Sequence, residues 1–175
     1  MSGITLHDAS IGNLLHGTIA LRNILQKASE QADSSAFPSA KLIDDMYPLT
    51  FQLKIATNMA EKAVKHLVAG SDVVMSDIKE GSTLADLIAR CDKTVELLKG
   101  VDAKAVNGKE DEVLSVQLGP NSKPVEITGK EFVFGHVLPN FFFHVNATYA
   151  ILRMKGVPIG KMDYLNPFMT FAPKV

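Results

Sequence analysis

The sequence predicts an all-α protein, an antiparallel four-helix bundle with a short β-hairpin between its third and fourth helices and an irregular apolar C-terminal tail. Three observations predict it. Apolar residues recur at steps of three and four over four segments, breaker-rich loops separate these segments, and one pair of short segments alternates at period two. With 175 residues, of which 46% are apolar and 21% charged, the chain has the composition of a globular domain. We expect that domain to span residues 1–175.

Two helices are predicted in the first part of the chain. The first covers about residues 6–29, and a loop rich in Ser and Ala with one Pro follows at residues 32–39. The second covers about residues 40–69 and stops at Gly70, a residue that commonly follows a helix end. Pro48 lies inside this second segment, so we expect a kink or a broken first turn there.

The third helix and the hairpin have clear local signals. Ser82 or Thr83 caps the helix, Asp86 favours its N-terminus, and Gly100 ends it. Residues 113–118 (VLSVQL) alternate at period two, a GPNS turn follows, and residues 124–127 (PVEI) alternate again, which is typical of a hairpin. Because two strands alone are marginally stable in water, we expect the hairpin to rest on the helices.

The fourth helix is predicted over about residues 129–155, ending before Gly156. Pro139 should break or bend it and leave residues 140–155 as the firmly helical part. The tail, residues 157–175, contains three prolines but many large apolar side chains. We expect it to pack on the bundle, over a pocket or onto a second subunit.

Composition argues against several classes of protein. The net charge is −1 and the basic residues are spread singly, so nothing indicates a nucleic acid or an anionic membrane surface as partner. Cys91 is the only cysteine, which excludes an internal disulfide and a thiolate zinc site and favours a small buried hydrophobe. The first residues do not resemble a secretory signal, and residues 132–145 are too short and too polar to cross a membrane. We therefore expect a soluble, cytoplasmic protein.

The fourth helix contains the polar spacing that best indicates a site. Asn140 and His144 are four residues apart, so they share one face among phenylalanines, and Thr148 extends that face by one turn. Burying an unpaired amide or imidazole costs about 1–3 kcal/mol, so both need polar partners. His144 is either a core histidine bonded to a neighbouring group, or a metal ligand or general base.

The second helix offers candidate partners. Asp45 and Gln52 are seven residues apart and would share a face of that helix. Asp45 is either a charge that favours the helix N-terminus or a carboxylate for His144, and Gln52 is either a buried amide or a site residue. His16 in the first helix could face the cavity or a neighbouring subunit. His66 is expected to be exposed, and Pro139 prevents us from assigning His136 to the face of His144.

The segments LPNFFFHVNATYAILRMKGVPIGKMDYL (residues 138–165) and KLIDDMYPLTFQLKIATNMA (residues 41–60) resemble a family of uncharacterised proteins related to the DinB-like four-helix bundles. The resemblance implies metalloenzyme chemistry with a divalent metal, zinc or nickel, held by one histidine of the second helix and an H-x-x-x-H pair of the fourth. Carried over to this chain, the second histidine of the pair matches His144, the first falls on Asn140, and the remaining ligand falls near Gln52. Since amides are poor ligands for these metals, we expect the metal to be weakly bound or absent unless Asp45 joins it.

Three functions remain open from the sequence. The first is an enzyme or former enzyme with a cavity between the second and fourth helices, where His144 and Asp45 act on a small molecule. Its substrate-binding residues would be Gln52, Asn140, His16 and Thr148. The second is a ligand-binding protein without catalysis. The third is a structural homodimer in which the apolar tail and an exposed helix face form the interface.

Overall fold

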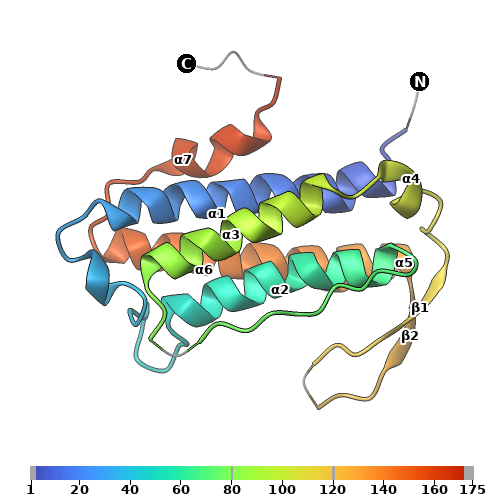
Figure 1. Ribbon diagram of the computed structural model, residues 1–175, viewed down its shortest axis with the longest axis horizontal. Helices are drawn as coiled ribbons and strands as arrows, with labels where there is room; N and C mark the ends of the chain where they lie inside the picture. Colours follow the sequence, from blue (N-terminus) through green and yellow to red (C-terminus); the bar gives the residue numbers. More distant parts are fainter. Residues whose placement is uncertain (1–2, 80, 120, 172–175) are drawn as a thin grey trace.

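Four long helices lie side by side around a shared core: α1 (Asn13–Ser29), α2 (Leu49–Leu67), α3 (Leu84–Lys99) and α6 (Leu138–Met154) (Figure 1). The computed structural model describes residues 3–79, 81–119 and 121–171. In the cycle of packed neighbours, α1 lies between α3 and α6, and α2 lies opposite α1 between the same two helices. The predicted helical bundle with a hairpin is confirmed.

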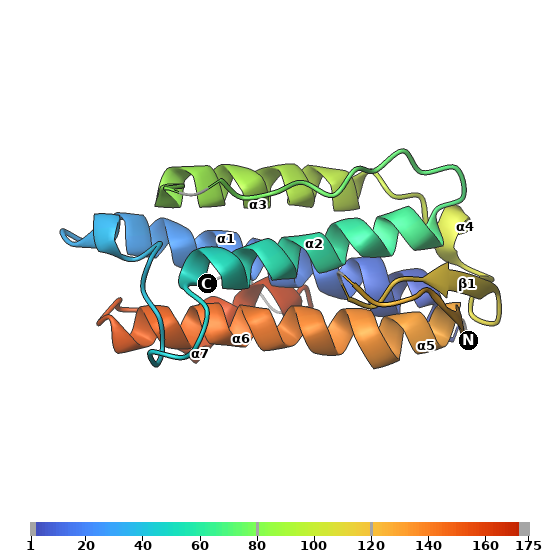
Figure 2. The ribbon, with the colours of Figure 1, turned by 90° about the horizontal axis from the view of Figure 1, so that it is seen from below.

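The long connection from α2 to α3 sets the direction of the helices. After α2 the chain returns along the bundle in an extended conformation over residues 68–79, and α3 then runs in the same direction as α2 (Figures 1 and 2). The antiparallel neighbours are consequently α1 with α3 and α2 with α6.

Helix α2 begins later than the sequence pattern indicated. Residues 40–48 form turns, Pro48 is the N-cap with φ −69° and ψ 168°, and the helix starts at Leu49. The predicted start at residue 40 is therefore wrong. Proline disfavours helical conformation in the residue before it and supplies no N–H, so Pro48 is tolerated at the start of a helix and not within it. The amide of Leu49 donates instead to the carbonyl of Ala40, at 2.9 Å.

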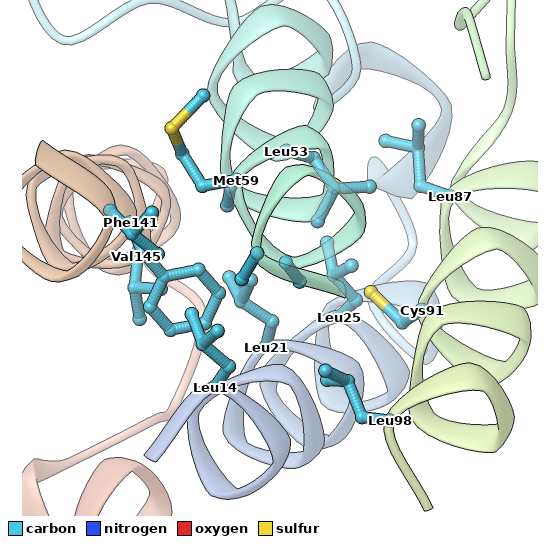
Figure 3. Packing of buried hydrophobic residues seen from close by; sticks show 14 of the residues in the cluster. Leu14, Leu21, Leu25, Leu53, Met59, Leu87, Cys91, Leu98, Phe141 and Val145 are labelled. Atoms are coloured by element: carbon cyan, nitrogen blue, oxygen red, sulfur yellow. The ribbon is translucent and has the colours of Figure 1, made fainter. Parts of the chain in front are cut away.

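The predicted cap of α3 is confirmed. The Thr83 hydroxyl accepts from the Asp86 amide, and the Asp86 carboxylate accepts from the Thr83 amide, which is a reciprocal capping box. Cys91 of this helix is fully buried, as expected. Figure 3 shows its thiol among leucines of α1, α2 and α3. Burial raises the pKa of this thiol to about 12.

Helices α1 and α6 approach closely at Gly17. A methyl group added at Gly17 would overlap the ring of Phe141, so only glycine allows this contact. Figure 3 shows Phe141 and Val145 of α6 pointing toward the leucines of α1. A π-helical turn, η1 (Asp8–Gly12), precedes α1.

The chain between α3 and α6 contains a short helix, α4 (Ala103–Val106), and the predicted hairpin. Strands β1 (Val113–Val116) and β2 (Val125–Thr128) are antiparallel, with Val113 opposite Thr128. Leu114 and Val116 of β1 are buried, so the hairpin rests on the helices as expected.

The chain is helical without a break from Gly129 to Met154, through α5 (Gly129–Glu131), the π-helix η3 (Phe132–Val137) and α6. The predicted break at Pro139 therefore does not occur. Pro139 lies in the first turn of α6, directly after the π-helix, where the hydrogen-bonding pattern already changes and a missing N–H costs little.

The tail packs on the bundle, which is one of the three outcomes expected. Helix α7 (Lys161–Leu165) and the 3-10 turn η4 (Asn166–Phe168) lie against α1. Lys27 of α1 forms an ion pair with Asp163 at 2.6 Å. Among the described residues, no helix is both long and apolar enough to cross a membrane.

Candidate functional site

A row of polar side chains lies between the antiparallel helices α2 and α6. Near the start of α2, Gln52 meets His144 of α6. Near the end of α2, Lys62 meets His136 of η3. The two pairs lie at opposite ends of α2 and differ in their surroundings, so we consider them in turn.

His144 and Gln52 form a closed pair. The Gln52 side-chain nitrogen donates to the carbonyl of Tyr47 at 2.9 Å, which orients its amide oxygen toward His144. That oxygen lies 2.7 Å from Nδ1 of His144, so Nδ1 carries the hydrogen and donates it. Burial lowers the pKa of His144 to about 4, so the ring is neutral at pH 7. Two aromatic rings contact the imidazole, those of Phe51 and Phe143.

Asp45, which was predicted to supply a carboxylate to His144 and Gln52, is not part of this pair. Asp45 is exposed in a turn before α2, so it does not share a helical face with Gln52. The prediction of that shared face is wrong, and its cause is Pro48, which delays the start of the helix. Gln52 makes its contacts with Tyr47 and His144.

The other predicted site residues are distributed over several contacts. The Thr148 hydroxyl is fully buried and donates to the carbonyl of His144 within the helix. His16 contacts the ring of Phe168, so it faces the tail. Asn140 is half-buried and lines a pocket on the side of Lys62. The structure thus brings together His144 and Gln52, and places Asn140 in the same pocket lining as Lys62.

The pocket that Asn140 lines lies between α2, α6 and the hairpin and has a volume of about 500 Å³. We call it the α2–α6 pocket. Its lining combines apolar, amide and basic side chains: Ile55, Asn58, Met59, Lys62, Lys65, His66, Met75, Ser115, Gln117, Leu118, Gly119, Pro124 and Asn140. Two lysines are among these residues and no carboxylate is, so the lining carries net positive charge.

Lys62 is the most unusual member of this lining. It is only 8% exposed, and no ion pair among the described residues includes it. Its Nζ donates to the carbonyl of Gln117 at 2.5 Å and lies 3.2 Å from Nε2 of His136. Burial without a countercharge lowers the pKa of Lys62. Burial and the nearby charge of Lys62 also lower the pKa of His136.

Lys62 was not among the predicted site residues, and the prediction that His66 is exposed is wrong. His66 is half-buried in the pocket lining and not exposed, because its ring packs edge-on against Phe132. The signal was present in the spacing. Ile55, Met59, Lys62 and His66 follow one another at steps of four, three and four, which places a lysine and a histidine in an inward stripe.

A second polar cluster lies on the other face of α2, toward α3. The guanidinium of Arg90 donates to Thr57, Asn58 and Ser76, and the Glu61 carboxylate accepts from the amide and hydroxyl of Ser76. Because Ser76 belongs to the long connection, these contacts hold that connection against α2 and α3. The cluster is therefore a structural clamp.

The metal ligands implied by the resemblance do not fit a transition metal here. Of the three positions, only His144 supplies an imidazole, and its Nδ1–H already faces the Gln52 oxygen. The described residues contain no group of three or more His, Cys, Asp or Glu side chains able to hold a metal. Amide oxygens are poor substitutes for imidazole toward zinc or nickel, so we derive no chemical step through a metal.

Comparison with known proteins agrees with this fold and leaves the activity open. A family model described as "Domain of unknown function (DUF1993)" matches residues 6–165. A crystal structure of a DinB family member protein from Shewanella denitrificans is similar to this chain at 27% sequence identity and a TM-score of 0.81, covering 96% of each chain. No curated protein matches. The fold is DinB-like.

Proposed function

We propose that this chain, which belongs to the DUF1993 family of unknown function, binds a small anionic molecule in the α2–α6 pocket. One observation supports this most directly. A pocket of about 500 Å³, a size suited to a small metabolite, has two lysines and no carboxylate among the described residues that line it. The proposal replaces His144 by Lys62 as the centre of the binding site.

The ammonium of Lys62 is the group that a bound anion would stabilise. A buried ammonium without a countercharge is destabilising, because water solvates it far better than the protein interior does. The Lys62 ammonium contacts a backbone carbonyl and a neutral imidazole nitrogen, which solvate it only in part. A carboxylate in the pocket would supply the countercharge, and it would be held more strongly here than at an exposed lysine.

The rest of the lining suits a ligand with an apolar body. Ile55, Met59 and Leu118 offer apolar contact, and Asn140 offers an amide for a hydrogen bond. Lys65 is exposed at the rim and adds a second positive charge that attracts an anion. We therefore expect an aliphatic carboxylate in preference to a neutral or cationic molecule.

Thermal unfolding tests the proposal. Small carboxylates, their amide analogues and their amine analogues are added to the wild type, Lys62→Met and Lys99→Met, where Lys99 is an exposed control on α3. A ligand at a hundred times its Kd stabilises by about 2.7 kcal/mol, which raises the Tm of a chain of this size by roughly 5–10 °C. We expect that rise only with carboxylates, in the wild type and in Lys99→Met. Equal shifts in Lys62→Met, or no carboxylate-dependent shift in the wild type, would contradict the proposal.

Catalysis by His144 with Asp45 is not part of this proposal. Asp45 is exposed in a turn, and no ion pair among the described residues joins it to the imidazole of His144. The neutral ring, with its lowered pKa, is a weak base. The positions of Gln52 and His144 support a structural contact between α2 and α6.

A homodimer is the second candidate, and exposed aromatic side chains near His144 favour it. Tyr47 is 63% exposed and Phe143 60% exposed, and both connect through ring contacts with Phe51 and His144 into one patch. Patches of this kind on a protein surface often mark interfaces. Light scattering of the wild type and of Tyr47→Glu tests it: a dimer that becomes monomeric in the variant supports this interface, and a wild-type monomer rejects it.

A further inference from the structure

We propose that Lys62 forms a covalent imine with a small oxo acid, an aldehyde or ketone that also bears a carboxylate, bound in the α2–α6 pocket. This inference rests on the proposed function and deepens it, because it names the ligand class and the atom that reacts. It assigns to Lys62 the role of nucleophile and to His136 the role of a proton acceptor beside it.

The geometry places a nucleophile and a base together at the pocket. Nζ of Lys62 lies 3.2 Å from Nε2 of His136, which is within reach for direct proton transfer. The His136 ring is positioned by Phe132, which stacks on it at a centroid distance of 6.1 Å and also contacts His66 edge-on. The packing of these three rings positions the imidazole of His136 beside the amine of Lys62.

The charges around Lys62 favour the free amine that the reaction needs. From α2, the ammonium of Lys65 and the imidazole of His66 line the pocket, and the imidazole of His136 in η3 contacts Lys62 directly. The hairpin contributes the carbonyl of Gln117. The part of the lining that the structure describes contains no carboxylate, so burial disfavours the ammonium form of Lys62 and lowers its pKa. An ordinary surface lysine, by contrast, is almost fully protonated at neutral pH and a poor nucleophile.

The reaction balances without an outside reagent. The ammonium of Lys62 gives one proton to Nε2 of His136, and the free amine attacks the carbonyl carbon, forming a C–N bond while the C–O π electrons move to oxygen. The resulting carbinolamine oxygen takes a proton from nitrogen and a second from the His136 imidazolium. It then leaves as water, and the nitrogen lone pair forms the C=N bond. The products are a protonated imine, whose positive charge faces the ligand carboxylate, and one water molecule.

Lys62 also has a structural contact that the test must separate from this role. Its bond to the carbonyl of Gln117 holds the hairpin to α2, so a loss of stability in a Lys62 variant would prove nothing about reactivity. The test therefore measures a covalent product. Lys62→Arg retains the positive charge and a donor for Gln117 but removes the reactive amine, and Lys99→Arg is the matched exposed control.

Reductive trapping provides that test. The full chain is incubated with glyoxylate, pyruvate or succinic semialdehyde and cyanoborohydride, and the modified lysine is identified by mass spectrometry. We expect a single secondary amine at Lys62, its loss in Lys62→Arg, its retention in Lys99→Arg, and its suppression by excess succinate. Propionaldehyde, which has no carboxylate, should label Lys62 more slowly. Labelling spread over the exposed lysines, or persisting in Lys62→Arg, would overturn the inference.

Two readouts distinguish this inference from the proposed function. If succinate raises the Tm of the wild type but no oxo acid is trapped at Lys62, the pocket binds anions and the imine is rejected. If neither occurs, both proposals are rejected. His136→Gln tests the proton acceptor: trapping should slow and its pH profile should move to higher pH, whereas an unchanged profile would reject that role.

Discussion

Replacing Arg90 by methionine should strongly destabilise the bundle, because this side chain is the centre of the buried clamp between α2, α3 and the long connection. The Arg90 side chain is 9% exposed, and its guanidinium donates to Thr57, Asn58 and Ser76 and lies 3.7 Å from the Glu61 carboxylate. Methionine keeps much of the volume but leaves the buried Glu61 carboxylate without a cation.

Breaking a buried ion pair by removing one partner costs about 3–5 kcal/mol. For a chain of this length that cost corresponds to a fall in Tm of roughly 6–20 °C. Calorimetry or chemical unfolding measures it. The matched control is Arg22→Met, which removes an ion pair with Asp92 between α1 and α3. The Arg22 side chain is 42% exposed and that of Asp92 50% exposed, so this variant should lower the free energy of unfolding by less than about 1 kcal/mol.

A double variant separates the charge from the packing. Adding Glu61→Gln to Arg90→Met removes the uncompensated carboxylate, so part of the lost stability should return. Two results would contradict the proposed role of the clamp. Arg90→Met could lower the free energy of unfolding no more than Arg22→Met does. Alternatively, adding Glu61→Gln to Arg90→Met could lower it further, by as much as the loss of a second independent contact.

Three further outcomes are expected. His144 has its ordinary pKa of 6.5 in the unfolded chain and a pKa of about 4 in the folded chain, so the unfolded state binds the extra proton between these values. The free energy of unfolding should therefore be constant above pH 6.5 and fall by about 2 kcal/mol, a value discounted for partial exposure, as the pH drops to 4. In a chemical-unfolding pH series, His144→Leu should remove this dependence. Gly17→Ala should cost about 1–3 kcal/mol because of the overlap with Phe141, whereas Gly12→Ala, whose nearest neighbour atom would lie 3.8 Å away, should cost nothing measurable in the same assay. Cys91 should react with a thiol reagent only after denaturant is added, since burial raises its pKa to about 12; reaction in the native state would show that the α3 core opens.

The helices and the hairpin could be predicted because their signals are local. The capping box of Thr83 and Asp86 involves residues three apart, and the period-two alternation at residues 113–116 needs only its own turn and partner strand. The two errors in the helices both involve proline. The apolar periodicity predicted a start of α2 at residue 40, whereas Pro48 is its N-cap. Pro139 is tolerated because it follows a π-helix, which the apolar periodicity does not predict.

The candidate site was predicted in part, for a similar reason. The contact between His144 and Gln52 follows from two inward polar residues on facing helices, and it is present. Asp45 was placed beside them only because the start of α2 was wrong. Lys62 was not predicted because lysine side chains are almost always exposed to solvent. Its burial depends on a hairpin residue 55 positions away in the sequence, and no local pattern predicts that the hairpin packs over α2.

The extended return of the chain after α2 has a consequence for how α3 is aligned. In two helices joined by a tight turn, the turn fixes their relative position along the helix axes. Helices α2 and α3 run in the same direction and are not joined by such a turn. The position of α3 along α2 is instead set by the packing of its buried apolar face and by the contacts of Arg90 with Thr57 and Ser76. We therefore expect residues inserted into the exposed part of this connection, ahead of Ser76, to leave α3 in place.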